Sequence, residues 1–409
     1  MKNWLLVISC WLLVFGANAQ TLSLDAVLSG IEKNNPLLQS YQNKIKGNDA
    51  LVEGAGAWMP PKAGLEFDQN PYGFDNFYAG TIRTSVMQDL PNFKMIDAKK
   101  NYLESISKID LNESLYERNK LFSEAKEAYY GIYISEKKIK ITKENIALLN
   151  SMVDLSQKQM QSGKGDLASI FKLKARLADK ETMIIHDENM IKTFCATINY
   201  LMNTDVEKLF LIDTTNIVKN YKNLIYLYNK DTIENKRSDI MQVNSVINSM
   251  KLNQNVMLLN SKPIFGFKFE NYAFESHSPV FSMMGTMTIP IVPWSAKGYK
   301  SEVKSMGFKI SAMEQEKENM INRTSQRIRM LVIEMNSEYS EIENYTKKVL
   351  PAYKKSFDSN MITYGQNTGD ALAILMAYDD LQMAQMKYIE HLETLLKVQV
   401  DYEKELQIR

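Results

Sequence analysis

The chain repeats short sequence landmarks at a constant spacing of 202 residues. Four landmark pairs share it: Pro61–Phe67 with Pro263–Phe269, Leu90–Phe93 with Val292–Ser295, Ser162-Gly163 with Tyr364-Gly365, and Ile31-Glu32 with Ile233-Glu234. Self-similarity at one fixed spacing is the signature of a structural unit that is used more than once. The sequence therefore predicts a tandem duplication, with repeats at 20–229 and 230–409.

Each repeat carries the same order of segments. An amphipathic helix (24–57 or 232–259) precedes two short alternating segments, and a very long helical segment follows (92–161 or 296–363). After a tight, glycine-containing turn, a returning helix closes the repeat (166–202 or 370–406). At 1.5 Å per residue, a helix of roughly 70 residues extends about 100 Å, which is longer than a compact domain of this mass. Pro351 interrupts the second long helix and predicts a kink or a junction there.

The last helix shows which kind of helix to expect. Its apolar and large residues advance by three and four positions in turn: Ala371, Ile374, Tyr378, Leu381, Gln385, Tyr388, Leu392, Leu395, Gln399, Tyr402 and Leu406. A seam of this kind, sustained over several heptads, is typical of coiled coils. The sequence thus predicts a mainly α protein built from long coiled-coil hairpins.

The short segments at 62–70, 78–88, 263–271 and 280–289 alternate with a period of two. Phe265, Phe267 and Phe269 share one face, for example, opposite Lys268 and Glu270. This alternation predicts β-strands with one apolar and one polar face. A soluble sheet with its apolar face on a core is one interpretation. A transmembrane barrel fits the long flanking helices better, and because four strands cannot close a barrel, three chains would together supply twelve.

The first nineteen residues resemble a secretory signal peptide. Lys2 precedes an apolar run from Trp4 to Phe15, and Ala17-Asn18-Ala19 is an A-x-A cleavage site. Two alternatives are an uncleaved anchor and a lipoprotein signal that uses Cys10, whose apolar core would be short. No later stretch has the length of apolar residues that a membrane helix needs.

Charge and chemistry exclude several classes of protein. Lys and Arg number 49 against 48 Asp and Glu, so no general basic field favours nucleic acid. The two cysteines cannot form a four-thiolate site, and the three histidines are far apart, so neither a metal nor another cofactor is expected. Met283, Met284 and Met287 cannot converge on a soft metal if they lie on a strand. Sequence motifs of hydrolases, metalloproteases or nucleotide enzymes are missing, so the chain is not expected to be an enzyme.

In these features the chain resembles the TolC family of outer-membrane efflux proteins. Leu22 to Val27 with Asn34 to Leu37 is similar to the opening helix of that family, and Gln88 to Pro91 to its strand-to-helix turn. Tyr364-Gly365 with Gly369 to Leu372 is similar to its Tyr-x-x-Gly tip and return helix. The order of the duplicated segments carries the resemblance more than any single motif does.

The resemblance implies a homotrimer with a twelve-stranded barrel in the outer membrane and an α-helical tunnel in the periplasm. It also implies a passive exit duct that works with a periplasmic adaptor and an inner-membrane pump of the RND or ABC type. Its substrates would be drugs or metal ions, or proteins in type I secretion. The sequence does not identify the substrate or the partner pump. The alternative from another class is a periplasmic coiled-coil adaptor or scaffold.

The hairpin turns are the expected functional sites. Asp166 and Asp370 stand where N-caps of the return helices are needed, and one of them could also belong to an acidic ring that gates the tunnel. Gly163, Leu167, Gly365 and Leu372 are the candidate adaptor contacts, although the leucines could equally be core residues. A further set of charges is expected to face the barrel lumen: Glu66, Asp68, Arg83, Lys268 and Glu270.

Overall fold

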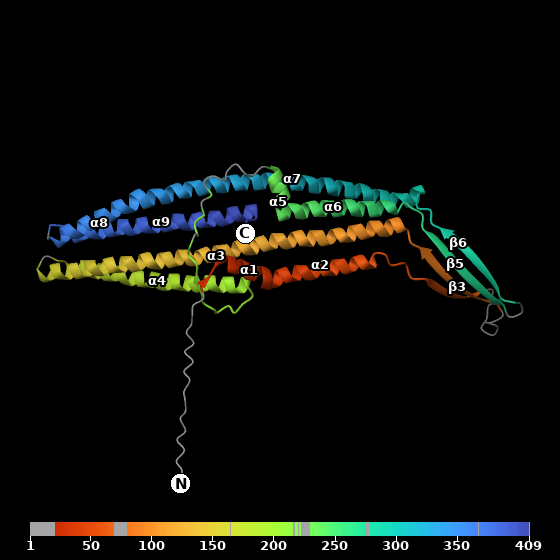
Figure 1. Cartoon of the computed structure of the whole chain (residues 1–409), viewed down its shortest axis with the longest axis horizontal. Helices are drawn as coiled ribbons and strands as arrows, with labels where there is room; N and C mark the ends of the chain where they lie inside the picture. The colour runs from red at the N-terminus through yellow and green to blue at the C-terminus, as the bar shows by residue number, and fades with distance from the viewer. Residues whose placement is uncertain are drawn as a thin grey trace, which may run out of the picture. The chain divides into compact units, whose positions relative to one another are not determined.

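A computed structural model describes residues 21–68, 80–163, 165–215, 217–219, 221, 230–274, 278–366 and 368–408 (Figure 1). The predicted signal peptide lies outside these residues. The chain divides into two compact units: unit 1 (Met1–Asn35, Leu121–Tyr221, Glu334–Val400) and unit 2 (Pro36–Lys120, Lys222–Ile333, Asp401–Arg409). Each unit draws on both predicted repeats, and the repeat boundary at 229/230 stays a prediction. Within the described ranges, no helix has the length and apolar character required to cross a membrane.

The described part of the chain is mainly helical. Its helices are α1 (Leu24–Asn34), α2 (Pro36–Gly54), α3 (Phe93–Gln161), α4 (Leu167–Leu201), α5 (Lys230–Lys236), α6 (Ser238–Leu259), α7 (Pro293–Asn344), a π-helix (Tyr345–Val349), α8 (Leu350–Gly365) and α9 (Ala371–Leu406). Its strands are β1 (Thr21–Leu22), β2 (Lys62–Asp68), β3 (Thr81–Leu90), β4 (Leu211–Ile212), β5 (Phe265–Phe274) and β6 (Val280–Met287). Helix α3 has 69 residues, so the predicted length of about 100 Å is confirmed.

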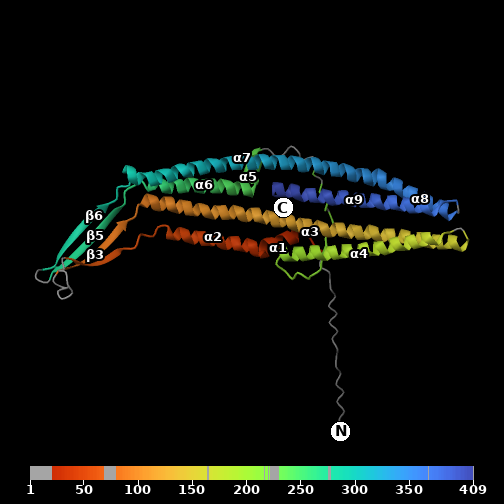
Figure 2. The same cartoon turned by 180° about the vertical axis from the view of Figure 1, so that it is seen from behind.

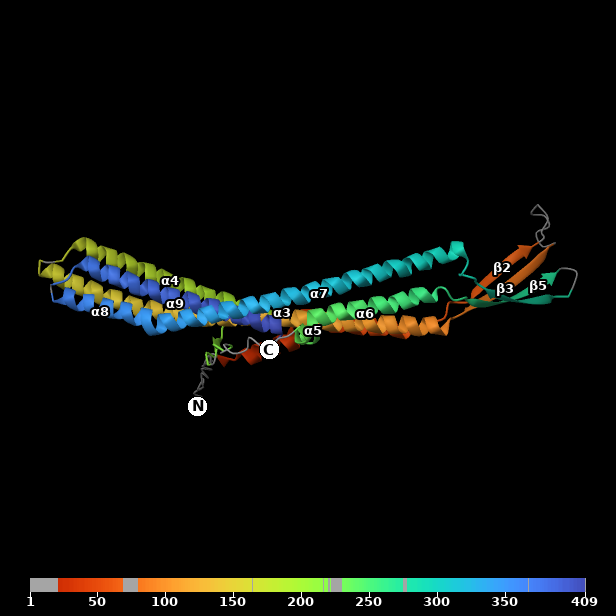
Figure 3. The ribbon, with the colours of Figure 1, turned by 90° about the horizontal axis from the view of Figure 1, so that it is seen from above.

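Unit 2 contains a four-stranded antiparallel sheet in the order β2-β3-β5-β6 (Figures 1 and 3). Because cross-strand partners share a face, the register sorts the side chains into two sets. One face is apolar and exposed: Leu65, Phe67, Val86, Leu90, Phe265, Phe267, Phe269, Phe281, Met283 and Met287. The opposite face carries the charges. The predicted alternation is therefore present, and no described residue covers the apolar face as a second layer would.

In unit 1, two helical hairpins share one core. Helices α3 and α4 form the first hairpin and α8 and α9 the second, as the view from behind also shows (Figure 2). All four helices contribute to a buried cluster that includes Leu149, Leu173, Phe357 and Tyr378. The predicted α9 seam supplies the inner face of this packing, since Tyr378, Leu395, Gln399 and Tyr402 are almost fully buried. The coiled-coil prediction for this helix is confirmed.

Pro351 lies at a junction, as predicted. Helix α7 passes into the five-residue π-helix and then into α8, whose second residue is Pro351. Proline has no N–H to donate to the preceding turn, and its ring crowds that turn. A local widening to i→i+5 hydrogen bonding accommodates this defect without ending the helix.

The opening helix of each repeat is broken, which the sequence pattern did not predict. Asn35 separates α1 from α2, and Arg237 separates α5 from α6, again 202 residues apart. Both residues have an extended backbone, with ψ of 124° in each case. The amphipathic pattern continues across the break, so periodicity alone gave one helix where the structure has two.

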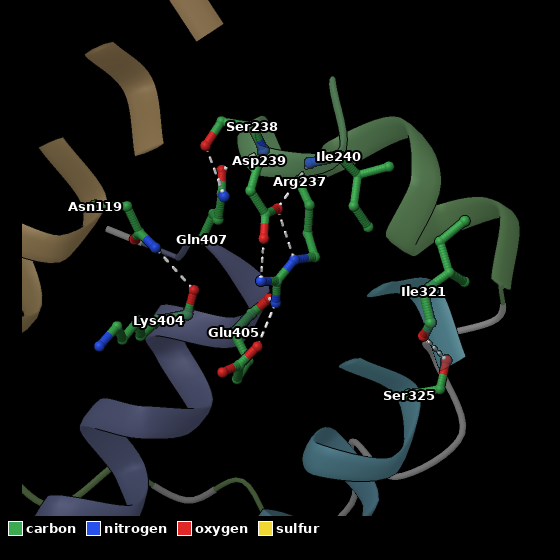
Figure 4. Close-up of polar contacts among 10 residues, drawn as sticks. All are labelled: Asn119, Arg237, Ser238, Asp239, Ile240, Ile321, Ser325, Lys404, Glu405 and Gln407. Carbon is green, nitrogen blue, oxygen red and sulfur yellow. Dashed lines mark hydrogen bonds and ion pairs between the residues drawn. The ribbon is translucent and has the colours of Figure 1, made fainter. Parts of the chain in front are cut away.

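Both break residues hold the end of a return helix. Asn35 Nδ2 donates to the carbonyl of Leu201 at 2.9 Å, and Arg237 Nη1 donates to the carbonyl of Glu405 at 2.9 Å (Figure 4). The last carbonyls of a helix have no partner within the helix, so these side chains satisfy groups that burial would otherwise penalise. The same solution thus recurs in the two repeats with different side chains.

The return helices also end alike. Asn203 and Gln407 both have φ of 54°, and the next residue donates back to the carbonyl five positions earlier: Thr204 N to Asn199 O and Ile408 N to Glu403 O, each at 2.9 Å. This is the Schellman ending of a helix. Gln407 is an unusual residue for a left-handed position, but its side chain accepts from Ser238 N and donates to Ser238 Oγ (Figure 4).

Candidate functional site at the hairpin tips

The first hairpin turns between the end of α3 and the start of α4, within unit 1. Gly163 has a φ of +72°, a conformation that favours glycine because it has no Cβ. Asp166 then caps α4: its carboxylate accepts from the backbone N–H groups of Ala168 at 3.1 Å and Ser169 at 3.3 Å. The carboxylate is therefore the N-cap of α4, as the sequence predicted.

The second hairpin turns between α8 and α9 in the same way. The carboxylate of Asp370 accepts from the backbone N–H of Leu372 at 3.2 Å. The N–H groups of Thr368 and Gly369 both donate to the carbonyl of Thr363, which closes the end of α8. The two turns have equal length, 162–166 and 366–370, but α8 continues through Gly365, two residues beyond the equivalent of the α3 end, and the spacing between equivalent residues changes there from 202 to 204.

Two glycines that were not among the candidate adaptor contacts make these turns possible. A Cβ on Gly165 would lie 2.5 Å from Met160 N, and a Cβ on Gly369 would lie 2.8 Å from Tyr364 N. By contrast, a Cβ on Gly365 would meet no atom within 4 Å. The signal that could have found them is the Gly-Asp dipeptide, which stands before both return helices.

Asp166 and Asp370 come together at one depression of about 410 Å³. Its rim includes Ser169, Lys172 and Tyr364, and Leu372 also lines it. Of the other candidate contacts, Gly163, Leu167 and Gly365 do not line the depression, although Leu167 and Leu372 are about half exposed. The two carboxylates thus stand beside one lysine in a shared, water-accessible hollow.

Below the tips, polar contacts join the two hairpins. Gln159 Nε2 of α3 donates to the carbonyl of Tyr364 at 3.0 Å, and the Tyr364 ring is buried. Arg176 of α4 binds Asp379 of α9 through two parallel hydrogen bonds of 2.5 and 2.8 Å. A two-pronged guanidinium–carboxylate pair fixes both distance and orientation. These contacts hold the tips in a defined position, and of the four residues only Tyr364 was part of a tip motif in the sequence analysis.

Further along the same helices, ionisable groups are buried. Burial lowers the pKa of Lys180, whose ammonium lies 3.4 Å from the sulfur of Met183. Burial also raises the pKa of Asp187, with the charge of Lys138 acting in the opposite direction. Lys138 itself binds Glu393 at 3.1 Å. Charged groups inside a helical bundle reduce its stability, so this part of unit 1 is held less firmly than its core cluster.

The strand charges form a connected network on the polar face of the sheet in unit 2. Arg83 binds Glu66 at 3.0 Å and Asp68 at 2.7 Å, and its guanidinium lies 4.9 Å from the centre of the Tyr272 ring. Lys268 binds Glu270 at 2.6 Å. All five predicted charges therefore share the face opposite to the exposed apolar residues. Their position relative to a pore stays a prediction.

Metal binding has no support in the described ranges. They contain no group of three or more His, Cys, Asp or Glu side chains placed to hold a metal ion. The register places Met283 and Met287 on the apolar face and Met284 on the other, as the alternation predicted. Cys195 is a buried thiol whose pKa burial raises.

No protein-family profile matches the chain, and no curated protein matches its sequence. Solved structures nevertheless match its fold over 94% of its length. The outer-membrane channel OprN has a TM-score of 0.78 at 14% identity, with 89% of that chain covered. CusC, which forms a transmembrane channel, has 0.78 at 13% with 91% covered, and the Vibrio cholerae outer-membrane protein VceC has 0.75 at 13% with 95% covered. The chain therefore has the fold of these outer-membrane channel proteins, with long helical hairpins and a small four-stranded sheet.

Proposed function

We propose that the chain is the outer-membrane channel of a tripartite efflux pump and acts as a passive exit duct rather than an enzyme. The observation that carries this proposal is the sheet: one face is exposed and apolar, while the other bears an ion-paired network of charges. The apolar face is suited to contact with lipid, and the charged face is suited to a water-filled lumen. The edge strands β2 and β6 have no further partner among the described strands, which suits pairing with other copies.

The proposed assembly is a homotrimer with twelve strands in the outer membrane. Three sheets of four strands exceed the roughly eight that a closed barrel requires. The helices would extend into the periplasm, where the tips of unit 1 would meet an adaptor. The adaptor would connect the duct to an inner-membrane pump of the RND or ABC type, and small molecules such as drugs or metal ions would pass through it.

Membrane fractionation and bilayer conductance test this function. The chain should appear in the outer-membrane fraction as a trimer whose gel mobility changes on heating. Purified protein should give discrete conductance steps in planar bilayers. A monomer in the soluble periplasmic fraction would favour the alternative of a coiled-coil adaptor instead.

The tip carboxylates are proposed to influence ion passage, since Asp166 and Asp370 line one hollow. Replacement of Asp370 by Ala should lower the preference for cations over anions, because a threefold ring of carboxylates attracts cations. The same replacement at Asp154, an exposed α3 carboxylate outside the hollow, is the control. Unchanged selectivity in Asp166→Ala and Asp370→Ala channels would remove the gating role while leaving the duct itself intact.

A further inference from the structure

The two helices at the edges of unit 1 are α4 and α8. Helices α3 and α9 lie between them, joined by a hydrogen bond of 2.8 Å from Asn145 to Gln385 and by the ion pair of Lys138 with Glu393. Helix α4 and helix α8 exchange no hydrogen bond or ion pair in the described part of the chain, and they lie at opposite sides of the bundle in the two views (Figures 1 and 3).

Helix α8 is unusually exposed for a helix in a bundle. Only Phe357 and Tyr364 of its sixteen residues are buried. The six residues 351–356 are all exposed, so more than one full turn has no packed side. Ile362 is also 60% exposed. A helix with so little burial is not stabilised by its own chain alone, since most helical stability in proteins comes from packing.

The exposed charges of α8 and of the π-helix before it follow a fixed order from the tip. Counted back from Gly365, Asp358 lies seven residues away, the doublet Lys354-Lys355 ten to eleven, and the doublet Lys347-Lys348 seventeen to eighteen. The sequence of signs is therefore negative, positive, positive. Asp358 and the doublet Lys354-Lys355 are three to four residues apart within α8 and lie on the same side of that helix, and the doublet Lys347-Lys348 of the π-helix continues the order of signs.

Three exposed charges at heptad spacing on α4 follow the opposite order. Counted from Leu167, Lys174 lies seven residues away, Glu181 fourteen and Glu188 twenty-one. The sequence of signs is positive, negative, negative, and the heptad spacing places the three on one face. Leu167 and Phe171 precede them and are 49% and 61% exposed, and Phe171 lies four residues from the tip end of α4, where Ile362 lies three residues from the tip end of α8.

These side chains are available for another molecule. Within the described residues, the three α4 charges make no ion pair or side-chain hydrogen bond, and of the α8 charges only Lys347 does, with the exposed Glu343 at 2.7 Å. At 1.5 Å per residue, each α4 charge differs from its counterpart on α8 or the π-helix by about 6 Å or less in distance from the tip. Long lysine and glutamate side chains span such an offset.

We propose that this edge of α4 and this edge of α8 are the two halves of a contact between neighbouring copies of the chain. Lys174 would face Asp358, Glu181 the doublet Lys354-Lys355, and Glu188 the doublet Lys347-Lys348, with the apolar side chains meeting near the tips. Two different surfaces on opposite sides of one bundle make a head-to-tail contact, which closes into a ring when the rotation between copies closes, as it would in the proposed trimer. The proposal rests on the proposed trimer and names the helices and charges that set its register near the tips.

Cysteine cross-linking tests the placement directly. In a chain with Cys195→Ala, Glu181→Cys and Lys354→Cys should be joined by a short bis-maleimide into covalent dimers and trimers on a denaturing gel. The matched control is Asp179→Cys with Lys354→Cys, because Asp179 is exposed at nearly the same depth but about 200° away around α4. Equal linking of the two pairs, or linking of neither in a trimer, overturns the proposal.

Charge reversal tests the energetics in the same full-length protein. Glu181→Lys with Glu188→Lys should speed trimer dissociation in detergent by about tenfold, since two attractions per contact become repulsions. Reversing both doublets in the same chain (Lys347→Glu, Lys348→Glu, Lys354→Glu and Lys355→Glu) should restore the rate, because every copy carries both edges. High salt should reduce the difference.

The outcomes distinguish failure of the proposed function from failure of the proposed contact. A wild-type chain that is not trimeric by light scattering overturns both the proposed function and this contact. A stable wild-type trimer in which the reversed chain is unaffected, or is not rescued, overturns the contact alone.

Discussion

Arg237 holds the carbonyl and the carboxylate of Glu405, and it does so from the break between two helices. It also makes two hydrogen bonds to Asp239, of 3.0 and 2.7 Å, so its buried guanidinium satisfies two carboxylates and a helix end together. These groups give the pKa of Arg237 an upward shift against the opposing effect of burial. The relationship is the counterpart of Asn35 with Leu201 in the other repeat.

Removal of the Arg237 guanidinium should lower the stability of the fold. Arg237→Ala leaves Asp239 and Glu405 with uncompensated charge in a partly buried place, which should destabilise the fold by about 3 kcal/mol. Arg237→Lys should recover only part of this, because an ammonium cannot make the forked contacts. Arg327, which binds Asp401 at 2.6 Å with both side chains about two-fifths exposed, is the control. Arg327→Ala should cost less than about 1 kcal/mol in urea unfolding followed by circular dichroism.

The geometry of the hairpin turns predicts that alanine substitutions at Gly165 and Gly369 affect stability differently from one at Gly365. Gly165→Ala and Gly369→Ala place a Cβ against backbone atoms that cannot move away, so each should destabilise unit 1 by about 1–3 kcal/mol. Gly365→Ala should be neutral or slightly stabilising, since it is helical and its surroundings are open. Limited proteolysis at the tips would measure this order, and a more sensitive Gly365→Ala variant would contradict it.

The carboxylate caps have a measurable stabilising role apart from any gating. Asp166→Ala should destabilise by about 1 kcal/mol, whereas Asp166→Asn and Asp166→Ser should retain most of the stability because they can accept the same N–H groups. Thermal unfolding by circular dichroism distinguishes the three variants. Equal destabilisation by alanine and asparagine would show that charge, and not capping, matters at this position.

Asp187 should make the stability of unit 1 depend on pH. Burial raises its pKa, so its contribution to stability is complete at low pH and is lost as the pH rises through its folded-state value. Asp187→Asn should therefore stabilise the protein at pH 7, on the order of 1 kcal/mol, and have no effect near pH 3. Asp179→Asn, on the exposed side of the same helix, should show no such difference between the two pH values. Urea titrations at both pH values provide the measurement.

Several features could be predicted from the sequence because each depends on a local pattern of residues. The strand alternation, the α9 seam and the Pro351 junction each follow from side-chain spacing or from the missing proline N–H. Asp166 and Asp370 were found as caps because a cap is defined by its place before a helix. The helix breaks at Asn35 and Arg237 were missed because the apolar period runs through them, although Pro36 disfavours helical backbone at Asn35. The carbonyl that each break residue holds lies far along the chain.

The sequence by itself determined the duplicated order of segments, the long hairpins and the two-faced strands, because periodicity and turn chemistry act over neighbouring residues. Only the tertiary structure decided which distant residues meet. It placed Asp166 and Asp370 at one hollow and joined Arg176 to Asp379. The physical reason is that these relationships depend on helix-to-helix register, which is set by packing between hairpins and has no local signal in either hairpin alone.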